Sequence, residues 1–162
     1  MGGGTGWILD EIITRQPEVH IDYVEASEKM ITLSAMRPID YSCINLIHGD
    51  ESQIPQNQSY DIVMTNFFLD VFEEERLIAV LRILNTVLSP NGVLICSDFQ
   101  KSEKFHHRVL LKAMHLFFRL SSNMDSKNLK DLHKHIQHNG FKLKQQAMGY
   151  DGLLFSNVYT KY

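Results

Sequence analysis

Helical and strand-like segments alternate along the first part of the sequence, and this alternation restricts the fold more than any other feature. In the helical segments apolar residues recur every three or four positions, whereas the strand-like segments are short apolar runs. The predicted elements are a helix at 7–16, a strand at 20–25, a helix at 27–36, strands at 44–47 and 61–68, a helix at 73–88 and a strand at 92–99. Such alternation predicts an α/β fold with a doubly wound, Rossmann-like and mostly parallel sheet.

The last part of the sequence has a different pattern. Two helices are predicted at 103–121 and 126–138, and two strands at 141–149 and 152–162 flank a turn around Gly149. Strands joined by so short a turn run antiparallel, so we expect an antiparallel C-terminal strand at the edge of the parallel sheet. The helix at 103–121 carries a wide apolar stripe. Three roles stay open for this stripe: core packing, a pocket for an apolar ligand, or the seam of a homodimer.

Length and charge exclude several classes of protein. The 162 residues suit one domain, and we expect a single domain over 1–162. A net charge of -3 lacks the basic excess of a nucleic-acid-binding protein. The start is glycine-rich rather than basic and then apolar, and no apolar run approaches the roughly 20 residues of a membrane span, so a cytoplasmic protein without membrane insertion is expected. The eight histidines lack an accompanying ligand set, and no metal site is expected.

The sequence starts MGGGTGW, with glycines at every second position from Gly2 to Gly6. A loop without side chains lets a ligand lie against the backbone. The spacing here is G-x-G-x-G, whereas the dinucleotide fingerprint is G-x-G-x-x-G and would need a glycine at Trp7. The spacing therefore disfavours a pyrophosphate cradle. Two interpretations stay open: a loop that binds another ligand, and the flexible remnant of a tag.

Polar residues follow the first three predicted strands. Glu25 ends the first strand, Asp50 follows the second, and Asn66 ends the third. In an open α/β sheet the carboxyl ends of the strands form the ligand-binding edge. A carboxylate at Glu25 can accept two hydrogen bonds from a ribose diol, and one at Asp50 can accept from an adenine amino group. Each residue alone is a common turn or cap residue, but together they predict a nucleoside site.

These features resemble class I S-adenosylmethionine-dependent methyltransferases. GGGTG is similar to the glycine loop of their first motif, VEAS to the second and HGDESQIP to the third, while YDIVMTNFFLDVF and LSPNGVLICSDF are similar to the fourth motif and the fifth strand. The closing helix and hairpin loosely resemble ubiquinone/menaquinone-type small-molecule methyltransferases. The family's first strand, which precedes the glycine loop at the centre of the sheet, has no counterpart in this sequence. A domain that is N-terminally truncated relative to the family is therefore expected.

The resemblance implies S-adenosylmethionine as cofactor and assigns roles to particular residues. The implied cofactor-binding residues are Gly2, Gly4, Thr5, Gly6, Glu25, Ala26, Asp50, Glu51, Asn66 and Phe67. Phe68 and Asp70 are implied to bind the methyl acceptor. Asp98 is the candidate for a catalytic base, which is needed only if the acceptor loses a proton; a helix N-cap is its alternative role.

The expected activity is methyl transfer from S-adenosylmethionine to a small acceptor, which we expect to be aromatic or apolar. The sulfonium makes the methyl group electrophilic, so holding the acceptor in line with it supplies much of the acceleration. Two rival functions stay open. One is a methyltransferase-like binding or assembly protein that has lost cofactor binding, which the missing strand would fit. The other is a nicotinamide-dependent oxidoreductase, which the glycine spacing disfavours.

Overall fold

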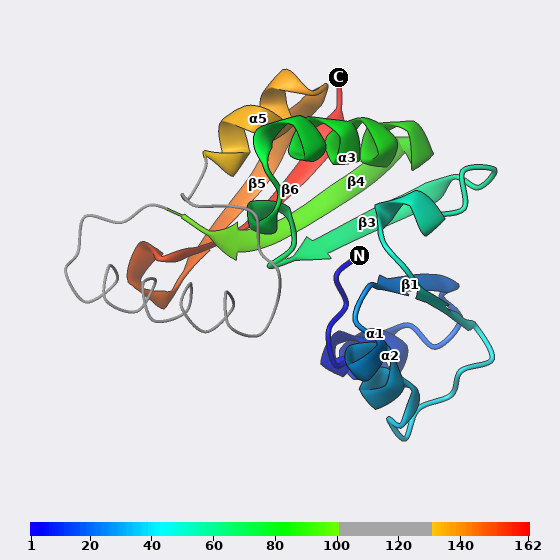
Figure 1. Ribbon diagram of the computed structural model, residues 1–162. Coiled ribbons are helices and arrows are strands. Elements are labelled where there is room, and N and C mark those ends of the chain that lie inside the picture. Colours follow the sequence, from blue (N-terminus) through cyan, green and yellow to red (C-terminus); the bar gives the residue numbers. More distant parts are fainter. Residues whose placement is uncertain (101–130) are drawn as a thin grey trace. The chain divides into compact units, whose positions relative to one another are not determined.

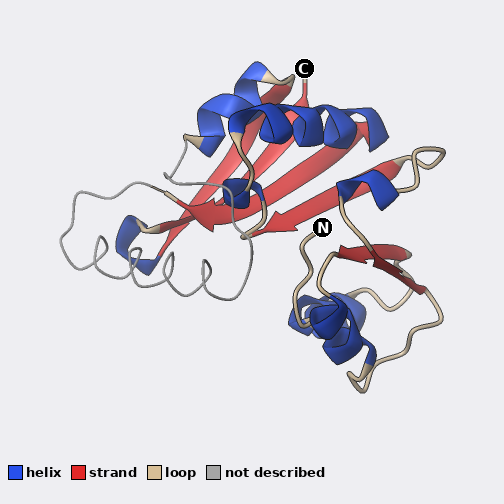
Figure 2. Ribbon diagram, in the orientation of Figure 1, coloured by secondary structure: helices blue, strands red, loops and turns tan. Residues whose placement is uncertain are grey.

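A computed structural model of the chain describes residues 1–100 and 131–162. The described residues form two compact units, Met1–Gln58 and Ser59–Tyr162, and each is treated by itself. The predicted helix at 103–121 and the beginning of the one at 126–138 lie outside the described residues. Figure 1 labels the helices and strands, and Figure 2 distinguishes the two kinds of element by colour.

The first unit contains two parallel strands and two helices. Its elements are α1 (Trp7–Arg15), β1 (Ile21–Glu25), α2 (Glu28–Ala35), β2 (Ile44–His48) and the short 3-10 turn η1 (Glu51–Gln53). In the parallel pair, Ile21 lies opposite Ile44 and Glu25 lies opposite His48. The hydroxyl of Ser27 accepts a hydrogen bond from the Met30 amide at 3.4 Å and caps α2. All four helices and strands predicted for this region are therefore confirmed.

The second unit is a four-stranded sheet with helices on one face (Figure 1). Its elements are β3 (Tyr60–Asn66), η2 (Leu69–Val71), α3 (Glu74–Val87), β4 (Leu88–Phe99), α5 (Leu132–His138), β5 (Phe141–Gly149), η3 (Tyr150–Gly152) and β6 (Leu154–Lys161). The strand order is β3-β4-β6-β5, with β3 parallel to β4 and β6 antiparallel to both of its neighbours. The Rossmann-like α/β class, with an antiparallel C-terminal strand, is thus confirmed.

The core of the second unit is formed by the residues that a period of two in the strands and of 3.6 in the helices places on one face. Along β4, Leu94, Cys96 and Asp98 are buried and the residues between them are less so, as expected of a strand with one covered face. The buried stripe of α3 consists of Leu77, Val80, Leu81, Leu84 and Val87. This is the helical face that the apolar spacing predicts.

Two details differ from the expected arrangement. Leu88 pairs with Tyr60 and Val93 with Ile62, so four residues of β4 bulge out opposite one residue of β3, where the sequence predicted a turn before the strand. The antiparallel strand β6 lies inside the sheet, and β5 rather than β6 forms the edge. The sequence could not show this, because a hairpin fixes that β5 and β6 are neighbours but not which of them also pairs with β4.

The strands pair as two separate sheets, β1-β2 and β3-β4-β6-β5, within the part of the chain that the structure describes. On β1, the Glu25 carbonyl accepts the Gly49 amide at 3.0 Å, while the Val24 carbonyl accepts the Gly2 amide at 3.1 Å. Successive carbonyls of a strand point to opposite sides, so the chain around Gly2 runs along the side of β1 away from β2. No helix of the described residues has the length and apolarity required to span a membrane.

Candidate functional site

The glycine loop packs so closely that two of its residues have no room for a side chain. A Cβ atom on Gly3 would lie 2.1 Å from ring atoms of Tyr23. A Cβ on Gly6 would lie 2.8 Å from the Ser34 Cβ, and Gly6 also has a φ of 77° at the N-cap of α1. Glycine is required at these positions for close approach and, at Gly6, for the left-handed backbone. The beginning of the chain thus forms a loop packed against Tyr23 and Ser34.

Glu25 joins this loop to the carboxyl end of β1. Its Oε2 accepts the Gly4 amide at 2.8 Å, and its Oε1 accepts the Ser27 amide at 2.8 Å. Each carboxylate oxygen has a second lone pair, so both can still accept a hydrogen bond from a hydroxyl group. The side chain predicted to bind a ribose diol therefore also fixes the direction of the loop.

Tyr23 contacts the same loop through both its hydroxyl group and its ring. Its hydroxyl donates to the Gly4 carbonyl at 2.9 Å, and its ring fills the space beside Gly3. Burial raises the pKa of Tyr23 to about 12. The hydroxyl therefore stays protonated, as a donor must, throughout the physiological pH range.

Asp50 and Ala26 lie beside Glu25 at the carboxyl ends of β1 and β2. The Gly49 amide donates to the Glu25 carbonyl at 3.0 Å, which places the chain leading into Asp50 next to Glu25. Asp50 accepts the Ser52 amide at 3.0 Å through Oδ1 and so caps η1. The Ala26 carbonyl lies 3.2 Å from Nε2 of His48, and Glu51 is largely buried.

The structure therefore brings together one set of predicted residues within the first unit. Gly4 and Glu25 are in direct contact, and Asp50 is connected to Glu25 through the backbone of Gly49. The rest of this set lies on the same loop or at the same strand ends: Gly2, Thr5, Gly6, Ala26 and Glu51. Backbone N–H groups and two carboxylates at the same strand ends are groups with which a nucleoside can form hydrogen bonds.

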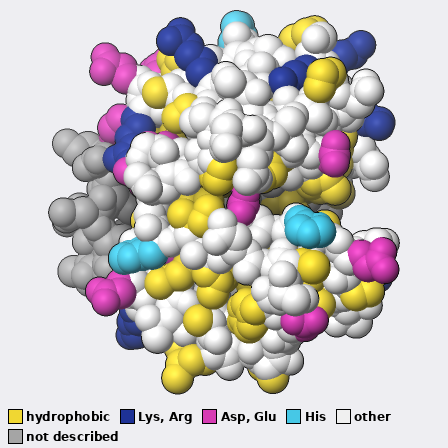
Figure 3. Space-filling model, turned by 90° about the vertical axis from the view of Figure 1, so that its right-hand side faces the viewer, with side chains coloured by type: hydrophobic (Ala, Val, Ile, Leu, Met, Phe, Trp, Pro, Cys, Tyr) yellow, Lys and Arg dark blue, Asp and Glu magenta, His cyan; other side chains and the backbone are white. Residues whose placement is uncertain are grey.

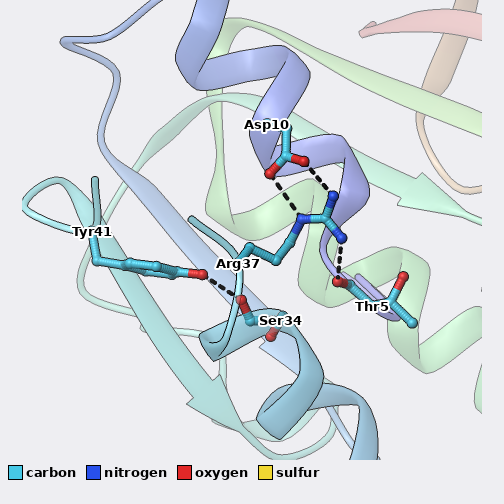
Figure 4. Close-up of polar contacts among 5 residues, drawn as sticks. All are labelled: Thr5, Asp10, Ser34, Arg37 and Tyr41. Carbon is cyan, nitrogen blue, oxygen red and sulfur yellow. Dashed lines mark hydrogen bonds and ion pairs between the residues drawn. The ribbon is translucent and has the colours of Figure 1, made fainter. Parts of the chain in front are cut away.

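Arg37 holds the first helix and the loop together (Figure 4). Its Nε donates to Asp10 Oδ1 at 2.8 Å, a second nitrogen pairs with Asp10 Oδ2, and Nη1 donates to the Thr5 carbonyl at 3.3 Å. The hydrogen bonds from Arg37 lower the pKa of Asp10 below its usual value. Nearby, the hydroxyl of Tyr41 donates to the Ser34 carbonyl.

The other predicted residues lie in the second unit, after β3 and at the end of β4. Asn66 ends β3, and Phe67 follows it with a positive φ of 51° while its amide donates to the Ser97 carbonyl at 2.8 Å. The Phe67 ring lies 5.0 Å from that of Phe99, and the Phe68 ring packs edge-on against Phe72 at 4.9 Å. A left-handed backbone at a bulky residue is uncommon and marks a segment held by its surroundings.

Asp98 holds that segment against the sheet. It is fully buried, accepts the Phe99 amide at 2.9 Å through Oδ1 and accepts the Asp70 amide at 3.3 Å through Oδ2. Burial, and then the negative charge of Asp70, raise the pKa of Asp98 well above its ordinary value. A carboxyl group in this state is protonated where an exposed aspartate is charged.

This burial predicts how stability depends on pH. Because the pKa of Asp98 is raised on folding, the folded chain keeps a proton that the unfolded chain releases, so the unfolding free energy should fall as pH rises above about 4 toward the folded pKa. Asp98→Asn removes the titrating group. We expect the wild-type unfolding free energy to fall more steeply between pH 4 and 7 than that of the variant. Urea denaturation over this pH range checks it, and parallel curves would contradict the assignment.

Sequence reasoning missed Tyr23 and Arg37 as partners of the glycine loop. Tyr23 is one apolar residue of a short strand, and Arg37 follows the end of a helix, so neither has a spacing that marks it. Their contacts depend on the folding back of β1 and α2 onto the loop, which spans 19 residues for Tyr23 and 32 for Arg37. In the sequence, the glycine-rich start MGGGTGW is the one signal of a close approach to other backbone or to a ligand.

A glycine loop, an acid at the end of the next strand and a further carboxylate after the following one define a Rossmann-like protein of the nucleoside-binding kind. Residues 1–94 match the family described as "Methyltransferase domain". The chain belongs to this methyltransferase domain family, and the resemblance seen in its motifs is confirmed.

Individual relatives agree with this membership. The chain is 28% identical over 104 residues to the malonyl-[acyl-carrier protein] O-methyltransferase of Halalkalibacterium halodurans, a match that covers 61% of this chain and 37% of the relative. It is 32% identical over 76 residues to the demethylmenaquinone methyltransferase of Staphylococcus saprophyticus, covering 46% and 32%. The crystal structure of TnmH has a TM-score of 0.77 at 18% identity and covers 100% of this chain and 48% of that one. The chain thus matches less than half the length of each of these proteins.

Proposed function

We propose that this chain binds S-adenosylmethionine at the glycine loop and Glu25, and that the protein transfers its methyl group to a small molecule. The observation that carries the proposal is the 2.8 Å hydrogen bond from the Gly4 amide to Glu25, which joins the loop to the acid at the end of β1. The cofactor supplies an electrophilic methyl group when bound. The residues present fit it, because Gly3 and Gly6 leave the backbone bare and the Glu25 oxygens retain lone pairs for ribose hydroxyls.

The remaining residues receive roles in the same proposal. Gly2, Thr5 and Ala26 line the cofactor site with backbone groups, and Asp50 and Glu51 lie on the adenine side. We assign Asn66 and Phe67 to the cofactor and Phe68 and Asp70 to the acceptor. Family membership supports this, because residues 1–94 include the whole first unit and the beginning of the second. For the same reason we propose that both units belong to one domain.

The acceptor is proposed to be a small aromatic or apolar molecule. The two curated relatives are named for chemically different acceptors, so the relatives alone leave the choice open. In this chain Phe68, the aromatic residue assigned to the acceptor, is half-buried and packs edge-on against Phe72, which suits contact with an apolar or aromatic molecule. Asp98 is buried and holds this segment in place through the Phe99 and Asp70 amides. It can serve as a base only in its deprotonated form, and only an acceptor that must lose a proton needs one.

Thermal denaturation with added ligand tests the cofactor assignment. S-adenosylhomocysteine should raise the melting temperature of the full chain, because a ligand at about 100 times its dissociation constant stabilises the folded state by about 2.7 kcal/mol. NAD at the same concentration should leave it unchanged. No shift with millimolar S-adenosylhomocysteine would favour a methyltransferase-like binding or assembly protein instead. A shift with NAD alone would favour the oxidoreductase.

A further inference from the structure

Side chains form hydrogen bonds with three polar groups of the loop backbone: the Gly4 amide, the Gly4 carbonyl and the Thr5 carbonyl. Glu25 accepts the Gly4 amide, Tyr23 donates to the Gly4 carbonyl, and Arg37 donates to the Thr5 carbonyl at 3.3 Å. Glu25 and Tyr23 come from β1, on which the loop rests. Arg37, which follows the end of α2, contacts the loop through its side chain (Figure 4).

The position of Arg37 is itself fixed at its backbone. Its amide donates to the Ser34 carbonyl at 3.2 Å, and the hydroxyl of Tyr41 donates to that same carbonyl. Ser34 is fully buried, and its Cβ lies where a side chain on Gly6 would begin. The end of α2 therefore touches the loop at Gly6, and the Arg37 side chain extends from this contact toward Thr5 and Asp10.

We propose that Arg37 is a positioning residue for the glycine loop: by tying the Thr5 carbonyl to Asp10 of α1, it keeps the Gly4 amide directed at Glu25 and so sets the affinity for the cofactor. The inference rests on the proposed function, and it adds to it a residue outside the motifs that carry the family resemblance. Arg37 acts through the backbone of the loop and needs no contact with the cofactor.

The chemistry of the guanidinium explains why arginine suits this position. Its planar fork can place two donors on the Asp10 carboxylate while a further N–H points elsewhere, here at the Thr5 carbonyl. Lysine carries one small ammonium group at the end of a flexible chain and does not reproduce this fork. The Arg37 and Asp10 side chains are 26% and 37% exposed, so the pair is partly shielded from water.

The test compares Arg37→Met and Arg37→Lys with two controls. Arg15→Met removes the other ion pair of α1, with Glu11 at 3.3 Å, which does not touch the loop. Ile54→Val lowers the stability of the same unit from its core. The dissociation constant for S-adenosylhomocysteine is measured through the fluorescence of Trp7, the single tryptophan of the sequence, which directly follows Gly6. Spectra of the full chain labelled with nitrogen-15 glycine report the Gly4 and Gly6 amides without ligand.

Both Arg37 variants should bind about tenfold more weakly than wild type, and the controls within about twofold of it. The Gly4 amide resonance should move in the Arg37 variants and stay in place in the controls, a readout that a loss of stability alone would not change. Unchanged affinity in Arg37→Met, or an equal loss in Ile54→Val, overturns the inference. If wild-type protein does not bind, the proposed function and the effect on affinity both fail, and the glycine spectra alone decide whether Arg37 positions the loop.

Discussion

Replacing Glu25 by alanine is expected to weaken binding of S-adenosylhomocysteine about a hundredfold, which corresponds to about 2.7 kcal/mol. The change removes the acceptor of the Gly4 amide and of the Ser27 amide, both at 2.8 Å, together with the proposed partner of the ribose hydroxyls. The charged acceptor makes these hydrogen bonds stronger than neutral ones. Isothermal titration calorimetry at a temperature where both proteins are folded measures the difference.

Asp22→Asn is the matched control for this change. Asp22 lies on the same strand, and its Oδ1 accepts the side-chain amide of Asn45 at 2.9 Å. The control removes one negative charge from β1 and keeps the Glu25 carboxylate that accepts the Gly4 amide, so its affinity should equal that of wild type. Equal affinities of wild type and Glu25→Ala would refute the ribose assignment, and an equal loss in Asp22→Asn would show that charge alone is responsible.

Gly6→Ala is expected to lower the unfolding free energy of the first unit by about 3 kcal/mol. An alanine at a φ of 77° has a strained backbone, which costs about 1–2 kcal/mol. Its Cβ would also lie 2.8 Å from the Cβ of buried Ser34, and overpacking costs about 1–3 kcal/mol. Urea denaturation followed by Trp7 fluorescence reports this unit, because the sequence has no other tryptophan.

Gly4→Ala separates the two costs. Gly4 has a φ of 65°, and an added Cβ would have no atom within 4 Å among the described residues, so this variant carries the backbone strain without the clash. It lies in the same unit as Gly6, so the Trp7 transition should report the strain alone, about 1–2 kcal/mol. Adding Ser34→Gly to Gly6→Ala should recover part of the loss by removing the clashing atom. A Gly6→Ala midpoint equal to that of wild type would contradict the packing described for the loop.

Much of the fold could be predicted because its signals are local. The spacing of Leu77, Leu81 and Leu84 marks a helix face whatever lies opposite, and Ser27 marks the beginning of α2 by its own hydrogen bond. The pairing of β6 with β4 could not be predicted, since the hairpin pattern fixes only that β5 and β6 are neighbours. The same limit applies to the bulge after Leu88, which is set by the register of a neighbouring strand.

The site could be predicted in part for a related reason. Parallel strands bring their carboxyl ends to one edge, so Glu25 and Asp50 were expected near each other before any contact was known. The hydrogen bonds of Tyr23 and Arg37 with the loop depend on distances between segments far apart in sequence, and no spacing encodes them. The burial of Asp98 could not be predicted either, because an aspartate at the end of a strand gives no local signal that separates a helix cap from a buried residue.

Strand β3 has β4 as its hydrogen-bonded strand neighbour in the described residues, and no strand pairs with its other side there. Such a side can accept an extended segment from another molecule. Ile62 on this strand is 55% exposed, and apolar side chains also reach the surface in the view of Figure 3, which favours association, whereas the charge of Asp61 opposes it. Protein concentration is therefore a variable in each measurement described above, and dilution series should accompany them.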